Sequence, residues 1–272
     1  MFSKFFHSSS SPRNPGRSAP CRSAQAAIAA AVLAAVGLLA GAASVTTGKT
    51  IYADSFTHPS KNLDGAKPTT DHGTSKVWTA GTQNRAGNGA GQGVGWTDGG
   101  YSATGYASGE AYLLFTPTSG HIYTLSAGIN WKSGNGGYSS LELGFIGTPN
   151  TRADLDHSSG YAFAAIRQAN ALLWRSAGKV YANPVDKKGT NKVSIVLNTT
   201  APKWTYEFTV NGKHYGPKAF SKNPKITAVG LGSGGGNMMG TFSKFSLTES
   251  VPAKPGLVGR KPSPAKPAKS AK

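Results

Sequence analysis

The sequence predicts an all-β protein built as an antiparallel two-sheet sandwich. Hydrophobic and polar residues alternate with a period of two in many segments between residues 51 and 248, which is typical of strands with one buried face. Glycine is abundant, with 36 residues, and only 15% of residues are charged, so the charged faces of amphipathic helices are missing. Many strands without covering helices must close into a barrel or stack as two sheets, and we expect a sandwich.

Three segments show the clearest alternation. They are residues 122–131, 192–198 and 204–210, and in the last of these Trp, Tyr, Phe and Val alternate with Thr and Glu. The pair Asn211-Gly212 follows and predicts a type I′ hairpin turn, because both central residues of that turn need positive φ. Further strands are expected at residues 51–56, 111–116, 140–147, 160–168, 171–176, 226–232 and 241–249.

Three stretches lack this alternation. Residues 61–76 and the glycine-rich residues 81–109 are expected to form surface loops or a flap over one sheet. The stretch GLGSGGG at residues 230–236 is interpreted as a glycine-rich hairpin. A phosphate-binding loop is not expected there, because no Lys-Ser or Lys-Thr pair follows and no βαβ unit surrounds it.

Charge and composition divide the chain into three parts, residues 1–45, 46–250 and 251–272. The formal net charge is +18. The first 50 residues contain five Lys or Arg and the last 22 contain six, and neither end contains an Asp or Glu. Most of the positive charge therefore belongs to the two ends of the chain, and the middle part is the domain that can build a core.

Residues 1–45 are interpreted as an N-terminal signal peptide. Three arginines precede the uncharged run Ala24–Thr47, which contains the small residues Ala40, Ala42 and Ser44 that suit cleavage. The alternative is an uncleaved anchor, and only then would the protein contact a membrane. The only cysteine, Cys21, precedes the run, so lipid attachment is not expected there. We expect export to an extracellular, cell-surface or periplasmic location without disulfides.

Residues 251–272 are expected to form a solvated, disordered basic tail, because they contain five prolines and no aromatic residue. Lysines spaced by proline and alanine would hold loosely to a polyanionic surface. Without aromatic side chains the tail offers no stacking for bases, so no specific nucleic-acid partner is expected.

Several motifs resemble one protein family. They are D-S-F at residues 54–56, NLDGAKP at 62–68, Trp78, HIYTLSAGI at 121–129, the stretch 196–212 and the closing stretch 229–249. Together they resemble the concanavalin A-like lectin/glucanase (laminin-G-like) jelly-roll domains, and especially those of bacterial secreted proteins that precede a PEP-CTERM sorting signal. The resemblance implies a jelly-roll sandwich over residues 46–250.

The chain departs from that family in two places. VPAKPG at residues 251–256 is similar to the start of the sorting signal, but no hydrophobic helix follows it. Many relatives carry Asp-Asn-Phe in the last strand, where this chain has Ser243-Lys244-Phe245. The resemblance therefore implies neither the sorting anchor nor a calcium site that uses that acid.

The sequence lacks the carboxylate pattern of a glucanase of this fold. Such an enzyme needs Glu-x-Asp-x-Glu on one strand, because alternate strand residues face the same way. The four glutamates, at positions 110, 142, 207 and 249, have no acid two residues away. The nearest pair, Asp154 and Asp156, is interpreted as a polar turn, with a structural calcium loop or a catalytic pair as alternatives. No serine-hydrolase elbow or zinc-ligand spacing is present, so no cofactor, metal or catalytic residue is expected.

Binding to a sugar combines an aromatic platform with amide or guanidinium donors. The candidate ligand-binding residues are Trp174, Tyr138, Tyr106, Tyr101, Arg167 and Asn170. The alternative is that Trp174 and Tyr138 fill the core or its rim.

These observations favour an exported, non-catalytic protein that binds a polysaccharide or cell-wall glycan, or serves as a cell-surface structural protein. One alternative is an adhesive matrix protein that holds polyanions through its basic tail. A second alternative is a glycoside hydrolase or polysaccharide lyase of the same fold.

Overall fold

The computed structural model of the protein describes part of the chain. The described residues are 48–57, 63–80, 96–97, 103–105, 109–133, 140–151, 155–156, 160–167, 171–175, 178–182, 185–186, 189–234 and 239–252. The predicted signal peptide, the alternative anchor and nearly all of the predicted tail lie outside them, so those interpretations stay predictions. Within these ranges no helix is long and apolar enough to cross a membrane.

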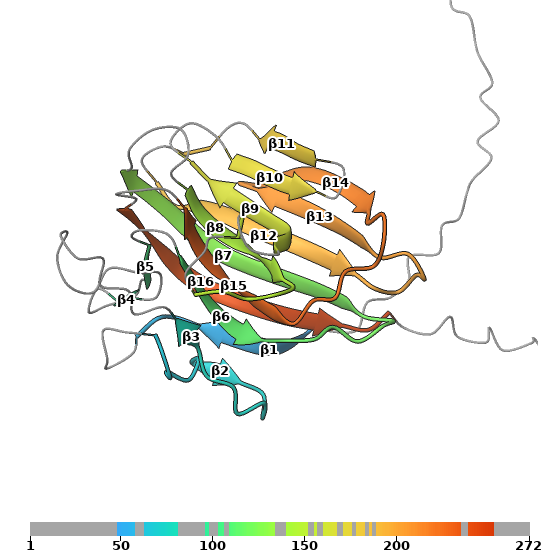
Figure 1. Ribbon diagram of the computed structural model, residues 1–272, viewed down its shortest axis with the longest axis horizontal. Helices are drawn as coiled ribbons and strands as arrows, with labels where there is room; N and C mark the ends of the chain where they lie inside the picture. The colour runs from blue at the N-terminus through green and yellow to red at the C-terminus, as the bar shows by residue number, and fades with distance from the viewer. Residues whose placement is uncertain are drawn as a thin grey trace, which may run out of the picture. The chain divides into compact units, whose positions relative to one another are not determined.

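The described residues form two antiparallel sheets (Figure 1). The first sheet has nine strands, in the order β14-β13-β12-β7-β16-β1-β2, with β5 paired to β16 and β4 paired to β5. Its strands are β1 Lys49–Asp54, β2 Thr70–Asp71, β4 Trp96–Thr97, β5 Ala103–Gly105, β7 Ile122–Ser133, β12 Asn191–Asn198, β13 Thr205–Val210, β14 Lys213–Ala219 and β16 Met239–Ser250.

The second sheet has seven strands, in the order β11-β10-β9-β8-β15-β6-β3. Its strands are β3 Thr79–Ala80, β6 Gly109–Leu114, β8 Ser140–Ile146, β9 Gly160–Ile166, β10 Ala171–Arg175, β11 Gly178–Ala182 and β15 Ala228–Gly234. The two sheets pack through β7 against β8 and through β12 against β9, which gives the predicted all-β sandwich (Figure 1).

The predicted alternation places the core correctly. The inward residues of β7, β12 and β13 are all buried, and they are Tyr123, Leu125, Ala127, Ile129, Trp131, Val193, Ile195, Leu197, Tyr206, Phe208 and Val210. They share one hydrophobic cluster with Leu141, Leu143 and Phe145 of the facing sheet. The predicted Asn211-Gly212 turn joins β13 to β14 with φ values of 50° and 83°, as a type I′ turn requires.

The family-like motifs near the N-terminal strand form one buried polar contact. Asp54, at the end of β1, is 2% exposed and accepts hydrogen bonds from Trp78 Nε1 at 2.6 Å and from the Phe56 backbone N–H at 2.6 Å. The Trp78 ring packs edge-on against Phe245 of β16 at 5.0 Å. This contact ties the segment after β1 to the end of the sandwich.

The interpretation of GLGSGGG as a hairpin is wrong for its first five residues, and the strand expected at residues 226–232 is correct for the first three of these and extends two residues further. Gly230–Gly234 belongs to β15, which lies between β6 and β8 and pairs with both. Close approach explains the glycines, because a Cβ at Gly230 would lie 2.3 Å from the Ala111 carbonyl oxygen. The stretches without clear alternation also contain short strands: β2 lies in residues 61–76, and β3, β4, β5 and the start of β6 lie in or beside residues 81–109.

Candidate functional site

The structure describes two of the six predicted ligand-binding residues. Tyr101, Tyr106, Tyr138 and Asn170 lie outside the described residues. Trp174 lies in β10, where its backbone pairs with Phe163 and Lys179. Its neighbour Leu173 is in the core, so the Leu173 side chain marks the inner face of the seven-stranded sheet, and the opposite side is the outer face of that sheet. Arg167 follows β9 directly and is half-buried.

That outer face carries two buried carboxyl groups that sequence reasoning did not pair. Glu110 of β6 and Glu142 of β8 both pair with Gly232 of β15, one from each side. Directly paired residues share a face, so the two glutamates lie in one row across the sheet with a glycine between them. They are 0% and 1% exposed.

Both carboxyl groups bind the segment that follows β8. Glu142 accepts hydrogen bonds from Ser140 Oγ at 2.7 Å and from the Leu155 backbone N–H at 2.7 Å. Glu110 accepts one from the Asn150 backbone N–H at 2.9 Å. A second hydrophobic cluster surrounds these contacts, and its members are Ile146, Leu155, Phe163, Ala165 and Ala228. In this conformation the glutamates hold the segment against the sheet.

Glu110 and Glu142 come close to one requirement of glycoside cleavage, the spacing of two carboxyl groups, but do not meet the requirement of access to a substrate. The two Cα atoms are two strand spacings apart, roughly 10 Å, and a glycosidase places its carboxyl groups about 5 to 9.5 Å apart. A catalytic carboxyl group must also reach its substrate, whereas these two are buried and bonded to the backbone of the overlying segment. Of the Asp154–Asp156 pair, only Asp156 is described. No three acidic or histidine side chains lie within metal-binding reach of one another in the described ranges.

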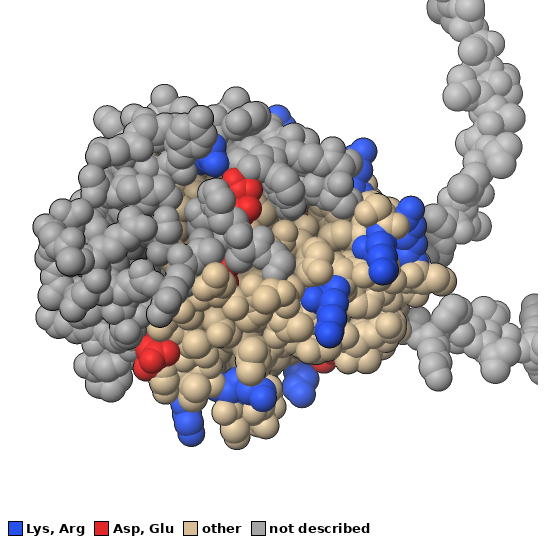
Figure 2. All heavy atoms as spheres, viewed as in Figure 1, with Lys and Arg blue, Asp and Glu red and all other residues tan. Residues whose placement is uncertain are grey.

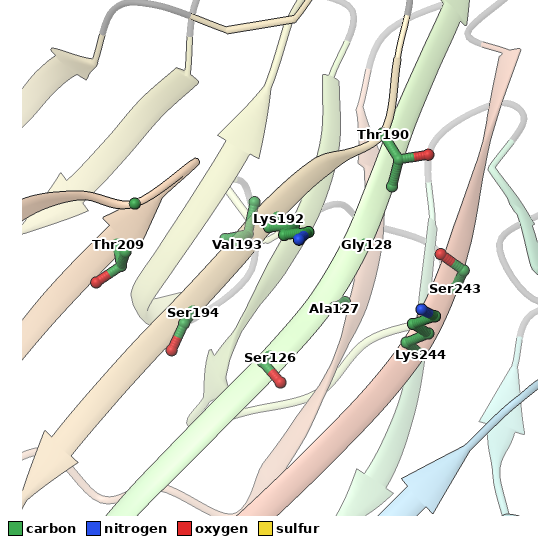
Figure 3. Close-up of a pocket in the computed structure, with 11 residues that line it drawn as sticks. Ser126, Ala127, Gly128, Thr190, Lys192, Val193, Ser194, Thr209, Ser243 and Lys244 are labelled. Atoms are coloured by element: carbon green, nitrogen blue, oxygen red, sulfur yellow. The ribbon is translucent and has the colours of Figure 1, made fainter.

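An open groove lies on the opposite side of the sandwich, on the outer face of the nine-stranded sheet (Figure 3). Its volume is about 590 Å³. The lining residues are Ser126, Ala127, Gly128, Thr190, Lys192, Val193, Ser194, Thr209, Gly212, Ser243 and Lys244. The side chains of Ala127 and Val193 belong to the core, and the other lining residues are glycines, hydroxyl-bearing residues and lysines.

A row of hydroxyl groups crosses the groove. Ser126 of β7 pairs with Ser194 of β12, and Ser194 pairs with Thr209 of β13. On its other side Ser126 pairs with Ser246 of β16, and the two Oγ atoms are 2.8 Å apart. The row therefore spans four neighbouring strands, with one hydroxyl about every 4.8 Å.

Gly128 forms the floor of the groove next to this row. It pairs with Lys192 on one side and with Ser243 on the other. A Cβ at this position would lie 2.6 Å from Ser243 Oγ and 2.9 Å from Thr190 Cγ2. Glycine therefore permits the close packing of the walls and keeps the floor free of a side chain.

Two asparagines fix the end of the groove where β12 begins. Asn191 is 0% exposed, accepts a hydrogen bond from the Asp186 backbone N–H at 2.8 Å and donates one to the Asp186 carbonyl at 2.9 Å. Asn211 Nδ2 donates to Asn191 Oδ1 at 2.8 Å, and Asn211 Oδ1 accepts from the Lys192 N–H at 2.9 Å. These bonds hold the adjoining residues Thr190 and Gly212 in place.

Lys244 stands in a bulge of β16. The pairing of β16 with β7 shifts between Ser243 and Ser246, and Lys244 has a φ of 53°. A bulge redirects the side chain that it contains, and positive φ is unfavourable for a residue with a Cβ. The side chain of Lys244 is exposed beside the groove (Figure 3).

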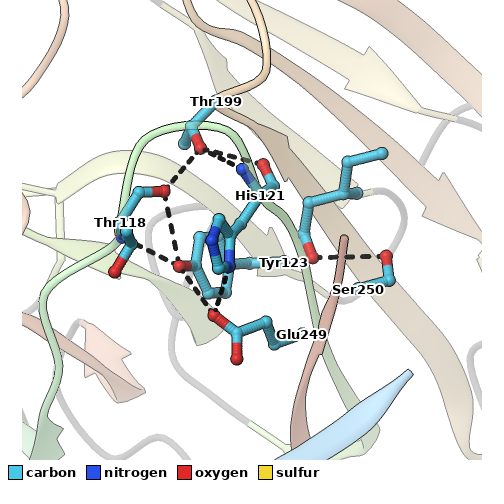
Figure 4. A network of polar contacts seen from close by, with 7 residues as sticks. Thr118, His121, Tyr123, Thr199, Glu249 and Ser250 are labelled. Carbon is cyan, nitrogen blue, oxygen red and sulfur yellow. Dashed lines mark hydrogen bonds and ion pairs between the residues drawn. The ribbon is translucent and has the colours of Figure 1, made fainter. Parts of the chain in front are cut away.

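A polar network lies where β7 begins, beside the ends of β12 and β16 (Figure 4). Glu249 Oε1 lies 2.7 Å from His121 Nδ1 and accepts a hydrogen bond from Tyr123 Oη at 3.0 Å. Thr199 Oγ1 donates to the Thr118 and His121 carbonyls at 2.7 Å and 2.8 Å. Burial raises the pKa of the Tyr123 phenol, and the nearby Glu249 adds to the effect. The network joins the start of β7 to the ends of β12 and β16, which is a structural role.

The sequence contained a weak signal for the groove. The alternation expected at residues 122–131 puts Thr124, Ser126, Gly128 and Asn130 on the face opposite the apolar residues, and the structure agrees, because Tyr123, Leu125, Ala127 and Ile129 are the core residues of this strand. Nothing in the sequence showed which polar faces would lie side by side. On the face shown in Figure 2, the described basic side chains lie in several separate groups and do not form one continuous patch.

The two antiparallel sheets, with β1 and β16 paired in the same one, agree with the two-sheet sandwich that the sequence resemblance implies. No family model and no curated protein matches the chain. Among solved structures, it is similar to an endo-1,3-beta-glucanase from Streptomyces sioyaensis, with a TM-score of 0.48 and 13% identity, covering 75% of this chain and 97% of that one.

Two further similarities are to glycan-related proteins. The carbohydrate recognition domain of Emp47p has a TM-score of 0.42 and 11% identity, with 74% and 96% coverage. A structure described with endo-acting O-glycanases of the human gut microbiota has a TM-score of 0.42 and 15% identity, with 76% and 100% coverage. Similarity at this level concerns the arrangement of the sheets and assigns no activity or ligand to this chain.

Proposed function

We propose that this chain is a non-catalytic glycan-binding β-sandwich protein and that its ligand occupies the groove on the nine-stranded sheet. The row formed by Ser126, Ser194 and Thr209 is the observation that carries the proposal. Each hydroxyl both donates and accepts hydrogen bonds, and so do the hydroxyls of a sugar. A row repeated at the strand spacing suits a polyhydroxylated chain.

Two features of the groove support binding over cleavage. Its described lining contains no Asp, Glu, His or Cys, so it offers neither the carboxyl pair that a glycosidase uses nor a histidine that would activate its serine and threonine hydroxyls. The hydroxyls stand on paired strands, and the bonds of Asn191 and Asn211 fix the end of the groove. A ligand therefore meets a preorganised surface, which lowers the entropy cost of binding.

A blocking variant tests this proposal. Ser194→Phe places an aromatic ring in the middle of the groove without changing charge. Val196→Phe is the matched control, because Val196 lies two residues along the same face of β12 and does not line the groove. We expect the full-length protein to bind at least one polysaccharide of a panel in isothermal titration calorimetry. Ser194→Phe should weaken that binding at least tenfold, while Val196→Phe should leave it unchanged.

Two results would contradict the proposal. One is that the folded protein binds no glycan at millimolar sugar concentration. The other is that Ser194→Phe binds as tightly as the unmodified chain while its melting temperature shows that it is folded.

A second candidate function is glycoside cleavage on the seven-stranded sheet, which the row of Glu110, Gly232 and Glu142 favours. It requires the segment around Asn150 and Leu155 to leave the sheet, because the glutamates are buried beneath it. The test is the release of reducing ends or unsaturated products from the same polysaccharides. Products that the unmodified protein forms and Glu142→Gln does not form would favour the enzyme.

Export and adhesion are part of the proposal. The Arg-rich start followed by Ala24–Thr47 supports export, and the six Lys and Arg of residues 251–272 support adhesion to a polyanionic surface. Cell fractionation with mass spectrometry of the N-terminus tests both. We expect a chain cleaved near Ser44 and retained at the cell surface. An intact chain in the cytoplasm, or a chain entirely free in the medium, would contradict export or adhesion respectively.

A further inference from the structure

We infer that the ligand of the groove is an acidic glycan and that Lys192 and Lys244 bind its carboxylate or sulfate groups. This inference rests on the proposed function and specifies the chemical class of the ligand. Three observations carry it: the positions of the two lysines, the charge of the lining and the backbone conformation of Lys244.

The lysines stand on opposite walls of the groove. Lys192 belongs to β12 and Lys244 to β16, and these strands flank β7 on either side. Gly128 of β7 pairs directly with Lys192 and with Ser243, the neighbour of Lys244. The walls are therefore two strand spacings apart, roughly 10 Å, across a floor without a side chain. Figure 3 shows the two side chains on either side of the Gly128 strand.

The described lining contains positive charge and no negative charge. Lys192 and Lys244 are its only charged residues, and both are exposed. The nearest acid along this face of β13 is Glu207, and its Oε1 lies 2.7 Å from Nδ1 of His214. Two ammonium groups beside an uncharged polar floor attract an anion, and a charge-assisted hydrogen bond is stronger than a neutral one.

The backbone of Lys244 argues for a role of its side chain. At a φ of 53° a glycine would be more favourable than any residue with a Cβ. Such positions persist only where the surrounding structure holds them, and they cluster at binding and active sites. The bulge between Ser243 and Ser246 presents this lysine next to the groove.

The same lining favours an acidic glycan over a nucleic acid. Among the described residues that line it there is no aromatic side chain, so the groove offers no platform for stacking bases, and a glycan is held there by hydroxyls and charge instead of by an aromatic ring. Its hydroxyls at Ser126, Ser194 and Thr209 suit the hydroxyls that an acidic glycan retains between its charged groups.

The test compares charge variants of the full-length protein. Lys192→Gln and Lys244→Gly remove the two ammonium groups, and the second also replaces a strained residue by glycine. Lys222→Gln is the matched control, because Lys222 is exposed in the turn after β14 and does not line the groove. The probes are polygalacturonate, chondroitin sulfate, a neutral dextran and duplex DNA, titrated by calorimetry at two salt concentrations.

We expect the unmodified protein to bind one or both acidic glycans at least tenfold more tightly than dextran. Each groove variant should weaken that binding about tenfold, which is the loss of one charge-assisted hydrogen bond. Lys222→Gln should bind as the unmodified protein does. Lys244→Gly should melt at the same temperature as the unmodified protein or higher. Polygalacturonate carries only carboxylates and chondroitin sulfate carries both carboxylates and sulfates, so tighter binding of chondroitin sulfate would indicate that sulfate contributes.

Each contrary outcome has a distinct meaning. Dextran binding equal to that of the acidic glycans, with no effect of Lys192→Gln, would overturn the inference and leave the proposed function intact. If DNA binds as tightly as the acidic glycans, and both lysine variants still bind DNA and glycan equally well, the attraction belongs to the basic chain ends. That result would also overturn the inference. Failure to bind any glycan would reject the proposed function itself.

Discussion

Replacing Glu142 tests whether this buried glutamate stabilises the fold, as a structural residue would, or is held in place for catalysis. Its carboxyl group accepts hydrogen bonds from Ser140 Oγ and from the Leu155 N–H, both at 2.7 Å. Glu142→Ala removes the acceptor of both bonds. Glu142→Gln keeps the shape and one acceptor oxygen and removes the carboxyl group.

The expected loss of stability follows from these two bonds. Ser140 is 1% exposed and Leu155 is 0% exposed, so water does not replace the missing acceptor. A buried donor left without an acceptor costs about 1 to 3 kcal/mol. Glu142→Ala should therefore lower the free energy of unfolding by about 3 to 5 kcal/mol, including the cavity that the truncation leaves. Glu142→Gln should lower it by about 1 to 2 kcal/mol.

Urea unfolding followed by tryptophan fluorescence measures the free energy of both variants. Hydrogen exchange then locates the effect, and the Leu155 amide should exchange faster in Glu142→Ala than in the unmodified protein. The control is Glu207→Gln, which changes an outer-face glutamate of the other sheet and should alter the unfolding free energy by less than about 0.5 kcal/mol. A loss below about 1 kcal/mol for Glu142→Ala, with unchanged exchange at Leu155, would refute the role of Glu142 in holding this segment.

Three further predictions concern the scaffold. Gly212→Ala should destabilise the protein by about 1 to 2 kcal/mol, because the turn holds position 212 at a φ of 83°; an unchanged melting temperature would contradict this. Burial raises the pKa of Tyr52 and Tyr123 above 10.0, the ordinary value of a tyrosine side chain. Above about pH 10 the unfolded chain therefore loses phenol protons that the folded chain keeps, and the free energy of unfolding should fall as the pH rises. Tyr123→Phe should make this fall shallower in urea titrations between pH 9 and 11, and an identical slope would argue against it. Asp54→Ala should cost about 2 to 4 kcal/mol and change the emission of Trp78, since Nε1 loses its acceptor; retained stability would show that this bond contributes little.

Strand faces could be predicted from the sequence because burial on one face leaves a local trace. In β7, each second residue from Tyr123 to Trp131 is apolar and buried, and the hairpin turn at Asn211-Gly212 is equally local. The short strands β2 to β5 have two or three residues each, too few to show a period. β15 was misread in part because its glycines look like turn residues, although close packing against the neighbouring strands explains them.

Contacts across strands could not be predicted, because register depends on chain segments far apart in the sequence. Glu110 and Glu142 lie in one row only because both pair with Gly232, and spacing along one strand gives no hint of this. The groove was missed for the same reason. Ser126 and Ser194 each look like ordinary solvent-facing residues until the strands that carry them become neighbours.

The most direct test of the proposed site is a nuclear magnetic resonance titration that locates the bound glycan on the folded protein. Amide resonances of Ser126, Gly128 and Ser194 should shift on addition of the glycan that binds most tightly, while those of Glu142 and Arg167 stay in place. Shifts confined to the seven-stranded sheet, around Glu142 and Arg167, would contradict the assignment of the groove as the binding site.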